Sequence, residues 1–244
     1  MSSKILGIVI PTYNEKNNIL VLLKKLKEVV ESEKIACTAL IMDDNSPDGT
    51  AQVVTNFIKE NQSIYLELEL KVRPGKMGLS SAYKQGFEYL KNGVEYLLSM
   101  DADLSHDPKY IPNFLNEAKK GYDLVIGSRY VNGGGVVNWG PVRKFISRFG
   151  SFYAGLILGG KINDYTGGYN FYKSSLFNSL DINRIQAQGY LFQIEMKYSF
   201  FKMGKKITEI PIIFHDRVDG KSKLSKSIVF EAFFGVPKLK FKKF

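Results

Sequence analysis

The 244-residue sequence predicts an α/β protein: a single domain on a mostly parallel sheet, followed by a short, amphipathic basic tail. Two observations predict this fold. Segments with strand and helix patterns alternate regularly through the first half of the chain, and polar clusters follow three of the predicted strands. Such alternation is typical of a doubly wound sheet, because parallel neighbours need a long crossover that is usually a helix.

Hydrophobic periodicity assigns the elements of this sheet in order. The predicted strands span residues 5–10, 39–42, 64–72, 94–100 and 122–126. The predicted helices between them span residues 15–32, 50–59, 80–91 and 108–120. In the first helix, Ile19, Leu22 and Leu26 are spaced so that they line one face, and Asp48 with Gly49 supplies a turn before the second helix.

Composition and charge limit the class of protein. Hydrophobic residues make up 44% of the chain, which is enough for a sizeable core. Cys37 is the single cysteine, which excludes a disulfide framework and indicates a reducing compartment. No apolar run approaches the length of a membrane span, and the stretch 5–10 is not expected to be a signal peptide. The net charge of +10 predicts an anionic partner: a nucleic acid, a nucleotide or an anionic membrane.

Asp101 and Asp103 directly follow the predicted strand 94–100, and polar clusters at 11–15 and 43–49 follow two other strands. Open α/β sheets bind ligands at the carboxyl ends of their strands, so we expect the three clusters to share one crevice. Two neighbouring carboxylates suit Mg²⁺ or Mn²⁺, and such an ion can hold a diphosphate. The alternative is an Asp-rich turn that caps the helix starting near Pro108.

Two common nucleotide-binding motifs are absent from the sequence. No Gly-x-Gly-x-x-Gly follows the first strand, and no complete Gly-x-x-x-x-Gly-Lys-Ser/Thr motif is present. A nucleic-acid binder would explain the positive charge but not an acidic crevice. The clusters therefore predict a sugar-nucleotide site, in which a carboxylate binds the base or ribose and a metal ion binds the diphosphate.

From Ile8 to about Ser225 the chain resembles glycosyltransferase family 2, and most closely its dolichol-phosphate (polyprenol-phosphate) mannosyltransferases. Motifs shared with many nucleotide-sugar transferases stand at residues 11–15, 43–50, 78–83, 101–106 and 127–130. Further motifs stand at Trp139, 143–148, 188–195 and 216–225, and those around Trp139 and 216–225 are typical of transfer to polyprenyl phosphates. At 167–170 the chain reads Gly-Gly-Tyr-Asn, where family members often have Ser-Gly-Phe-Arg or a close variant.

This resemblance implies a GT-A (Rossmann-like) catalytic domain over residues 1–226. It implies inverting transfer of mannose from GDP-mannose to dolichyl or polyprenyl phosphate, with Mg²⁺ or Mn²⁺ as cofactor. The implied catalytic residues are Asp103, Arg129 and Arg217. The implied nucleotide-sugar contacts are Pro11, Tyr13, Glu15, Asp44, Asp101, Ala102, Asp103 and Arg129. The implied metal site is Asp101, Asp103 and Ser105, and the implied acceptor-phosphate contacts are Arg143, Arg217 and Lys223.

A phosphate acceptor fits the shortage of catalytic bases in this sequence. A phosphate monoester has a second pKa of about 6, so it is largely ionised at neutral pH and needs no strong general base. The chain has two histidines, and we expect His106 to orient the acidic loop or bind phosphate rather than act as a base. The alternatives are transfer of glucose from UDP-glucose to the same lipids and, in a different class, non-catalytic binding of nucleotide sugars.

Residues 227–244 combine phenylalanines with lysines. We expect this tail to lie at a membrane interface, with the rings among the headgroups and the ammonium groups on anionic lipid. The alternative is a helix packed on the domain, followed by a basic end. Pro237 is expected to end the apolar part. The implied location is cytoplasmic, peripheral on the cytosolic face of a membrane (the endoplasmic reticulum if eukaryotic), with a small membrane-anchoring subunit as a candidate partner and no nucleic acid.

Overall fold

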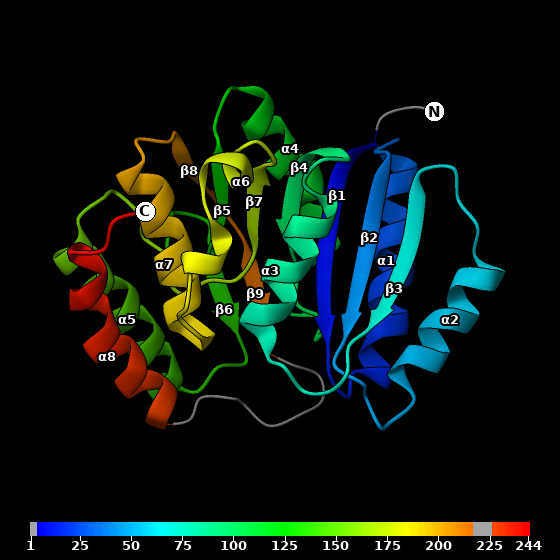
Figure 1. Ribbon diagram of the computed structural model, residues 1–244, viewed down its shortest axis with the longest axis horizontal. Coiled ribbons are helices and arrows are strands. Elements are labelled where there is room, and N and C mark those ends of the chain that lie inside the picture. Colours follow the sequence, from blue (N-terminus) through cyan, green and yellow to red (C-terminus); the bar gives the residue numbers. More distant parts are fainter. Residues whose placement is uncertain (1–3, 217–225) are drawn as a thin grey trace.

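The structure, a computed structural model, describes residues 4–216 and 226–244 (Figure 1). Within these residues the main sheet has seven strands in the order β3-β2-β1-β4-β7-β5-β8. Their bounds are β1 Lys4–Thr12, β2 Cys37–Asp43, β3 Leu66–Val72, β4 Val94–Ser99, β5 Leu124–Ser128, β7 Asn170–Lys173 and β8 Ile207–Pro211. A separate parallel pair joins β6 (Gly135–Val137) to β9 (Ile213–His215).

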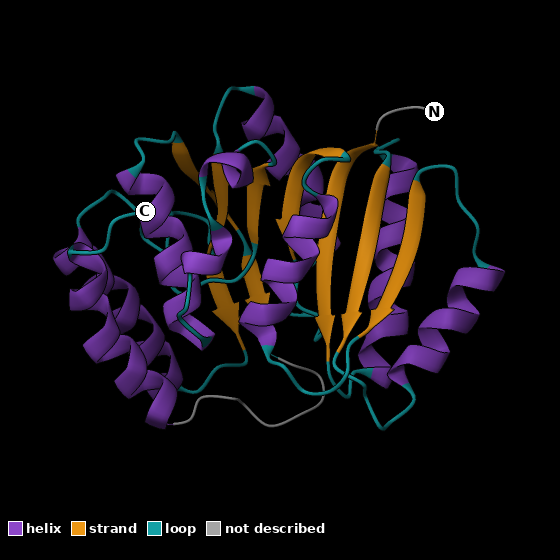
Figure 2. Ribbon diagram, in the orientation of Figure 1, coloured by secondary structure: helices purple, strands orange, loops and turns teal. Residues whose placement is uncertain are grey.

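Helices cover both faces of the main sheet (Figure 2). One face is covered by α1 (Lys16–Ser32), α2 (Thr50–Glu60) and α4 (Ile111–Lys119), the last preceded by a 3₁₀ turn at Pro108–Tyr110. The other face is covered by α3 (Leu79–Leu90), α6 (Leu176–Ser179) and α7 (Gly189–Lys202). At one end of the molecule, α5 (Pro141–Leu158) and α8 (Lys226–Lys240) lie beside each other and beside α7 (Figure 1).

The predicted α/β fold with a mostly parallel sheet is confirmed. All five predicted strands and four predicted helices are present, although 3₁₀ geometry forms the first turn of the segment predicted as helix 108–120. Strand β7, which is antiparallel to both β4 and β5, is not among the strands predicted from hydrophobic periodicity. A segment of four residues is too short to display a strand period, so its pairing depends on the neighbours.

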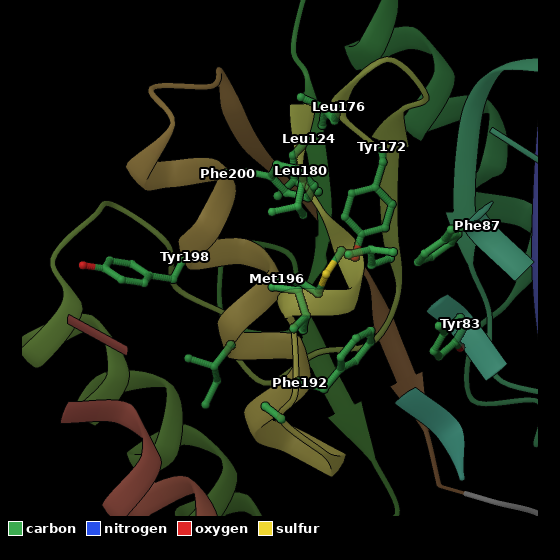
Figure 3. Packing of buried hydrophobic residues seen from close by; sticks show 14 of the residues in the cluster. Tyr83, Phe87, Leu124, Tyr172, Leu176, Leu180, Phe192, Met196, Tyr198 and Phe200 are labelled. Carbon is green, nitrogen blue, oxygen red and sulfur yellow. The ribbon is translucent and has the colours of Figure 1, made fainter. Parts of the chain in front are cut away.

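An aromatic cluster between α3, β7 and α7 fills the core on one face of the sheet (Figure 3). The rings of Phe87 and Tyr172 meet edge to face at 5.5 Å, and Tyr83 stacks against Phe192 at 6.4 Å. Met196 of α7 lies among these rings. Tyr83 has a further role, because its hydroxyl group leaves this core and reaches the carboxyl edge of the sheet.

The predicted tail is helical, and Pro237 does not end it. Pro237 lies inside α8, where it removes the N–H that would bond to the carbonyl of Phe233. The hydroxyl of Tyr153 donates to that carbonyl instead, at 2.9 Å. Val236 and Leu239 of α8 are buried in the same core as α7, and the predicted boundary at residue 226 stays a prediction. No helix in the described ranges is both long enough and apolar enough to cross a bilayer.

Close approach of α3 to β1 gives a stability prediction. A Cβ atom at Gly86 would lie 2.4 Å from Cγ1 and 3.3 Å from Cβ of Val9, which is fully buried. Gly86→Ala should cost about 1–2 kcal/mol of unfolding free energy, because overpacking outweighs the gain in helix propensity. Urea unfolding measures this change. Gly93→Ala is the control, since the nearest atom to its Cβ would be 3.7 Å away; a Gly86 variant as stable as this control would contradict the packing.

Candidate functional site

Three loops meet at the carboxyl edge of the sheet. Strands β2, β1 and β4 are adjacent and parallel, so the loops that follow them leave the same edge (Figure 1). Asp43 at the end of β2 ties the first two loops together: it accepts hydrogen bonds from the Thr12 hydroxyl at 2.8 Å and the Ser46 amide at 2.8 Å. Because Asp43 is fully buried, its role is structural.

A cleft of about 420 Å³ lies over this edge, which is within the usual range of about 300–1,000 Å³ for small-molecule sites. The predicted site residues that line it are Pro11, Tyr13, Glu15, Asp44, Asp101, Ala102, Asp103, Arg129 and Arg143. Ser105 is buried and is not part of the lining. Arg217 and Lys223 lie outside the described residues. The roles of all these side chains stay predictions.

Asp101 and Asp103 bring two carboxylates to the cleft. The Tyr83 hydroxyl donates to Oδ1 of Asp101 at 2.7 Å, and burial raises the pKa of Tyr83 well above its usual value, so it stays a donor. Oδ1 of Asp103 accepts from the Ser105 hydroxyl at 2.5 Å and from the Ser105 amide at 3.2 Å. Ser105, which does not line the cleft itself, therefore fixes the orientation of the Asp103 carboxylate.

This pair fits a divalent ion that is completed by a substrate. Among the described residues, no group of three or more His, Cys, Asp or Glu side chains is arranged to hold a metal. Mg²⁺ is commonly bound through one or two carboxylates together with substrate phosphates and water. Asp101 and Asp103 supply that minimum of hard oxygen ligands.

His106 fixes the backbone of the acidic loop. Its Nδ1 accepts a hydrogen bond from the Asp101 amide at 2.9 Å, and its ring stacks on Tyr169 with centroids 4.7 Å apart. An Nδ1 that accepts leaves the proton of the neutral ring on Nε2. This geometry matches the expectation that His106 orients the loop.

Each of the three loops contains a residue in the left-handed region of backbone conformation. Asn14 has φ +59°, Asn45 has φ +55° and Leu104 has φ +65°. Asparagine tolerates this region, whereas a leucine there costs of order 1–3 kcal/mol. The surrounding contacts therefore impose the shape of the Asp101–His106 loop.

Asp44 lies at the end of the cleft expected to hold the base and ribose. It is buried, paired with Arg73, and accepts hydrogen bonds from the amides of Met77 at 3.1 Å and Gly78 at 3.0 Å. Asp44 thus anchors the turn before α3. In the same region, Nζ of Lys76 lies 4.4 Å from the ring centroid of Tyr13.

Arg129, which lines the cleft, forms a buried ion pair with Asp164. Nε of Arg129 donates to Oδ2 of Asp164 at 2.7 Å, Nη2 donates to Oδ1 at 2.7 Å, and the Arg129 amide donates to Oδ2 at 3.0 Å. Burial alone would raise the pKa of Asp164, but the Arg129 charge and hydrogen bonds lower it to about 2. Burial alone would lower the pKa of Arg129, but the carboxylate raises it.

Arg143 of α5 lies next to this pair. Its guanidinium carbon stands 4.1 Å from the centroid of the Trp139 ring, and its Nη1 donates to Asp216 at 2.6 Å. Nε of Arg143 and Nε1 of Trp139 are buried donors that have no hydrogen-bond partner among residues 4–216 and 226–244. Buried donors are usually satisfied, so within the described part of the chain these two groups could donate to an oxygen-rich anion in the cleft.

Several residues of the site were missed by sequence reasoning. Those that line the cleft include Thr166, Gly168, Gln193 and Glu231. Tyr83 and Gln193 lie inside the motifs at 78–83 and 188–195, so membership of those motifs could have indicated that they belong to the site. No sequence motif around Asp164 indicates a role in the site. Only the fold brings it to Arg129, 35 positions away.

The chain is similar to known proteins both in sequence and in fold. The chain is 40% identical over 225 residues to the undecaprenyl-phosphate mannosyltransferase of Micrococcus luteus, covering 92% of this chain and 89% of that protein. It is 35% identical over 230 residues to the polyprenol monophosphomannose synthase of Mycolicibacterium smegmatis, covering 94% and 84%. Glucosyl-3-phosphoglycerate synthase from Mycobacterium tuberculosis, solved with Mn²⁺, UDP and glucosyl-3-phosphoglycerate, shares the fold with a TM-score of 0.69 at 14% identity, covering 99% of this chain and 81% of that one.

The sheet, its acidic carboxyl edge and these similarities define a glycosyltransferase with the GT-A fold. The chain belongs to glycosyl transferase family 2, whose model matches residues 7–181. The predicted family and fold are thereby confirmed.

The ion pair behind the cleft gives a pH prediction. Because the folded-state pKa of Asp164 is about 2 and its unperturbed value is 3.8, its stabilising contribution is present above about pH 4 and is lost as the pH falls toward 2. Asp164→Asn should therefore be less stable than the wild type at neutral pH, and the gap should narrow below about pH 3. Urea unfolding at both pH values tests this, with the exposed Asp181→Asn as control. A gap independent of pH would contradict it.

Proposed function

We propose that this chain transfers mannose, with inversion, from GDP-mannose to a polyprenyl phosphate such as dolichyl or undecaprenyl phosphate, with Mg²⁺ or Mn²⁺. One observation carries the proposal: the polar cleft adjoins an apolar pocket, so the site suits a ligand with a charged head and an apolar tail. The two relatives, an undecaprenyl-phosphate mannosyltransferase and a polyprenol monophosphomannose synthase, support a lipid-phosphate acceptor and mannose as the sugar.

The apolar pocket lies between α5, α7 and α8. Its lining includes Phe145, Phe149, Ile194, Phe233 and Val236. Thr166 and Tyr190 line both this pocket and the cleft, so the two spaces meet there. A phosphate placed near Arg143 and Arg129 would direct its prenyl chain into the pocket.

The roles of the side chains follow from their positions. Asp101 and Asp103 would hold the divalent ion, with Tyr83 and Ser105 fixing their carboxylates. When bound, this ion supplies positive charge to the departing diphosphate. Arg143 and Arg129 would hold the acceptor phosphate, together with Arg217 and Lys223 as the family resemblance implies.

The transfer itself needs little from a base. An ionised oxygen of the lipid phosphate attacks the anomeric carbon of mannose from the side opposite GDP, and the bond to lipid phosphate forms as the bond to GDP breaks. Because the acceptor phosphate is already largely ionised at neutral pH, no proton has to be removed. The site acts by holding the attacking oxygen in line and by neutralising charge.

A donor panel tests this function. With a short polyprenyl phosphate and Mg²⁺ or Mn²⁺, GDP-mannose should be turned over faster than UDP-glucose. Asp103→Ala should lower turnover by about 100-fold or more while the protein stays folded, because the change removes an electrostatic contact at a strand end. Asp181→Asn, a remote exposed acid, is the matched control. Preference for UDP-glucose would support the glucosyl alternative, binding without turnover would support a nucleotide-sugar-binding protein, and full activity of Asp103→Ala would contradict the metal site.

We also propose that the protein attaches peripherally to the cytosolic face of an anionic membrane through α5 and α8. An exposed apolar stripe runs along α5 through Val142, Phe145, Phe149, Phe152 and Leu156. Phe233 and Phe234 of α8 are exposed too. Lys144, Lys238, Lys240 and Lys243 are exposed on the same two helices and at the chain end. Phe145, Phe149 and Phe233 also line the apolar pocket, which would place the pocket mouth at the lipid surface.

Membrane attachment is tested by point substitution rather than by removing residues 227–244, since that deletion would also remove the buried Val236 and Leu239. Phe152→Ser with Leu156→Ser, at positions 64% and 72% exposed, should reduce co-sedimentation with anionic liposomes several-fold. High salt should remove only the lysine-dependent part of binding. Ile64→Ser, 90% exposed between α2 and β3, should bind like the wild type.

Unchanged sedimentation of the double variant would contradict the lipid surface. In that case a small membrane-anchoring subunit, rather than lipid, would be the partner of this face.

A further inference from the structure

Lys197 is a buried cation to which the proposed function gives no role. It lies in the middle of α7 and is fully buried. Its Nζ donates three hydrogen bonds, to the backbone carbonyls of Asp164 at 2.9 Å, Tyr165 at 3.1 Å and Gly167 at 2.6 Å. An ammonium group has three donors, so all of them are used on a single turn of the chain.

Burial of this ammonium group is unfavourable by itself. Burial lowers the pKa of Lys197 to about 7, and attraction to Asp164 opposes that change. An apolar side chain at this core position would avoid the desolvation cost. What the lysine contributes instead is a fixed conformation of residues 164–167.

The same turn holds Arg129. The carboxylate of Asp164 accepts from Nε and Nη2 of Arg129, and it also accepts from the Gly167 amide at 2.9 Å, which closes the turn. The Thr166 hydroxyl accepts a further bond from Nη2 at 2.9 Å. Nη1 of Arg129 makes no hydrogen bond to a described residue, and Arg129 lines the cleft.

The turn is also held from a second side. Oε1 of Glu209 in β8 accepts from the Asp164 amide at 3.0 Å. Lys197 and Glu209 therefore fix the backbone on both sides of the Asp164 side chain. A displacement of this turn would carry Asp164 with it, and Arg129 would follow through its two-point contact.

We propose that Lys197 is a positioning residue, which holds the 164–167 turn so that Asp164 presents Arg129 to the phosphate-binding end of the cleft. The inference rests on the proposed function for the identity of the ligand. Lys197 itself touches neither substrate nor metal.

The first test is a double-mutant cycle on transfer to a short polyprenyl phosphate. Lys197→Met keeps the length of the side chain and removes its charge and donors. It should lower kcat/KM by about 10- to 100-fold, because small displacements of a positioned group have effects of this size. Arg129→Lys keeps a cation beside Asp164 but loses the paired Nε and Nη2 hydrogen bonds to its carboxylate. In that background Lys197→Met should change kcat/KM by less than about 2-fold, since a residue that acts through Arg129 is not additive with it.

The controls separate positioning from general damage to the fold. Lys202→Met makes the same change at an exposed position of α7, where Nζ bonds the carbonyls of Lys240 and Lys242, and should keep kcat/KM within about 2-fold of the wild type. All variants are assayed below their unfolding temperatures. Lys197→Gln, which still donates two bonds, is the second variant if the methionine variant does not fold. Multiplicative losses in the cycle, or wild-type kcat/KM in Lys197→Met, would overturn the proposal.

A binding measurement keeps this test independent of turnover. Trp139 is the single tryptophan of the chain, and its ring centroid lies 5.4 Å from the guanidinium carbon of Arg129. Its fluorescence can follow the binding of inorganic phosphate, which has the chemistry of the acceptor head group, in the absence of a divalent metal. Lys197→Met should weaken this binding about 10-fold relative to Lys202→Met. Equal affinities, or no binding by the wild type, would overturn the proposal, whereas absence of sugar transfer alone would count only against the proposed function.

Discussion

The buried ion pair between Arg129 and Asp164 is the interaction on which the cationic end of the cleft depends. Arg129 directly follows β5, and Asp164 lies in the loop between α5 and β7, so the pair joins two segments that are distant in sequence. Lys197 of α7 and Glu209 of β8 bind the backbone around Asp164. An unpaired charge in this interior would cost several kcal/mol, so the four groups form one mutually dependent unit.

The acidic and the cationic side chains of the cleft are held by different kinds of interaction. At the acidic end, neutral hydroxyl donors from Tyr83 and Ser105 fix the carboxylates of Asp101 and Asp103 and leave their negative charge for a ligand cation. Arg129, by contrast, is held by the full negative charge of Asp164. Although the chain carries a net charge of +10, opposite charges are therefore sorted within a single cleft. This arrangement suits a ligand set that combines a metal-bound diphosphate with a second anion.

The sequence was sufficient for features that depend on local patterns. Strand and helix periods predicted the parallel half of the sheet, and the carboxyl-edge rule brought Asp101, Asp103 and Asp44 to one cleft. Features that depend on tertiary contacts were not predictable. Nothing near Lys197 in the sequence indicates that three backbone carbonyls accept its hydrogen bonds. Nothing near Pro237 indicates that the Tyr153 hydroxyl donates to the carbonyl of Phe233. The role of Asp164 requires a partner 35 positions away.

The antiparallel direction of β7 has an evolutionary consequence. Its first residue, Asn170, pairs with Ser99 at the end of β4, so the chain enters this strand from the cleft, whereas β1, β2 and β4 run toward it. The wall formed by Thr166 and Gly168 is thus built by a loop that precedes its strand, and the acidic wall by loops that follow theirs. Surface loops accept insertions more readily than strands do. An insertion ahead of residue 163 would leave both the 164–167 turn and the register of the strands that deliver the acidic pair unchanged, so the length of this loop can change during evolution without disturbing either set of side chains.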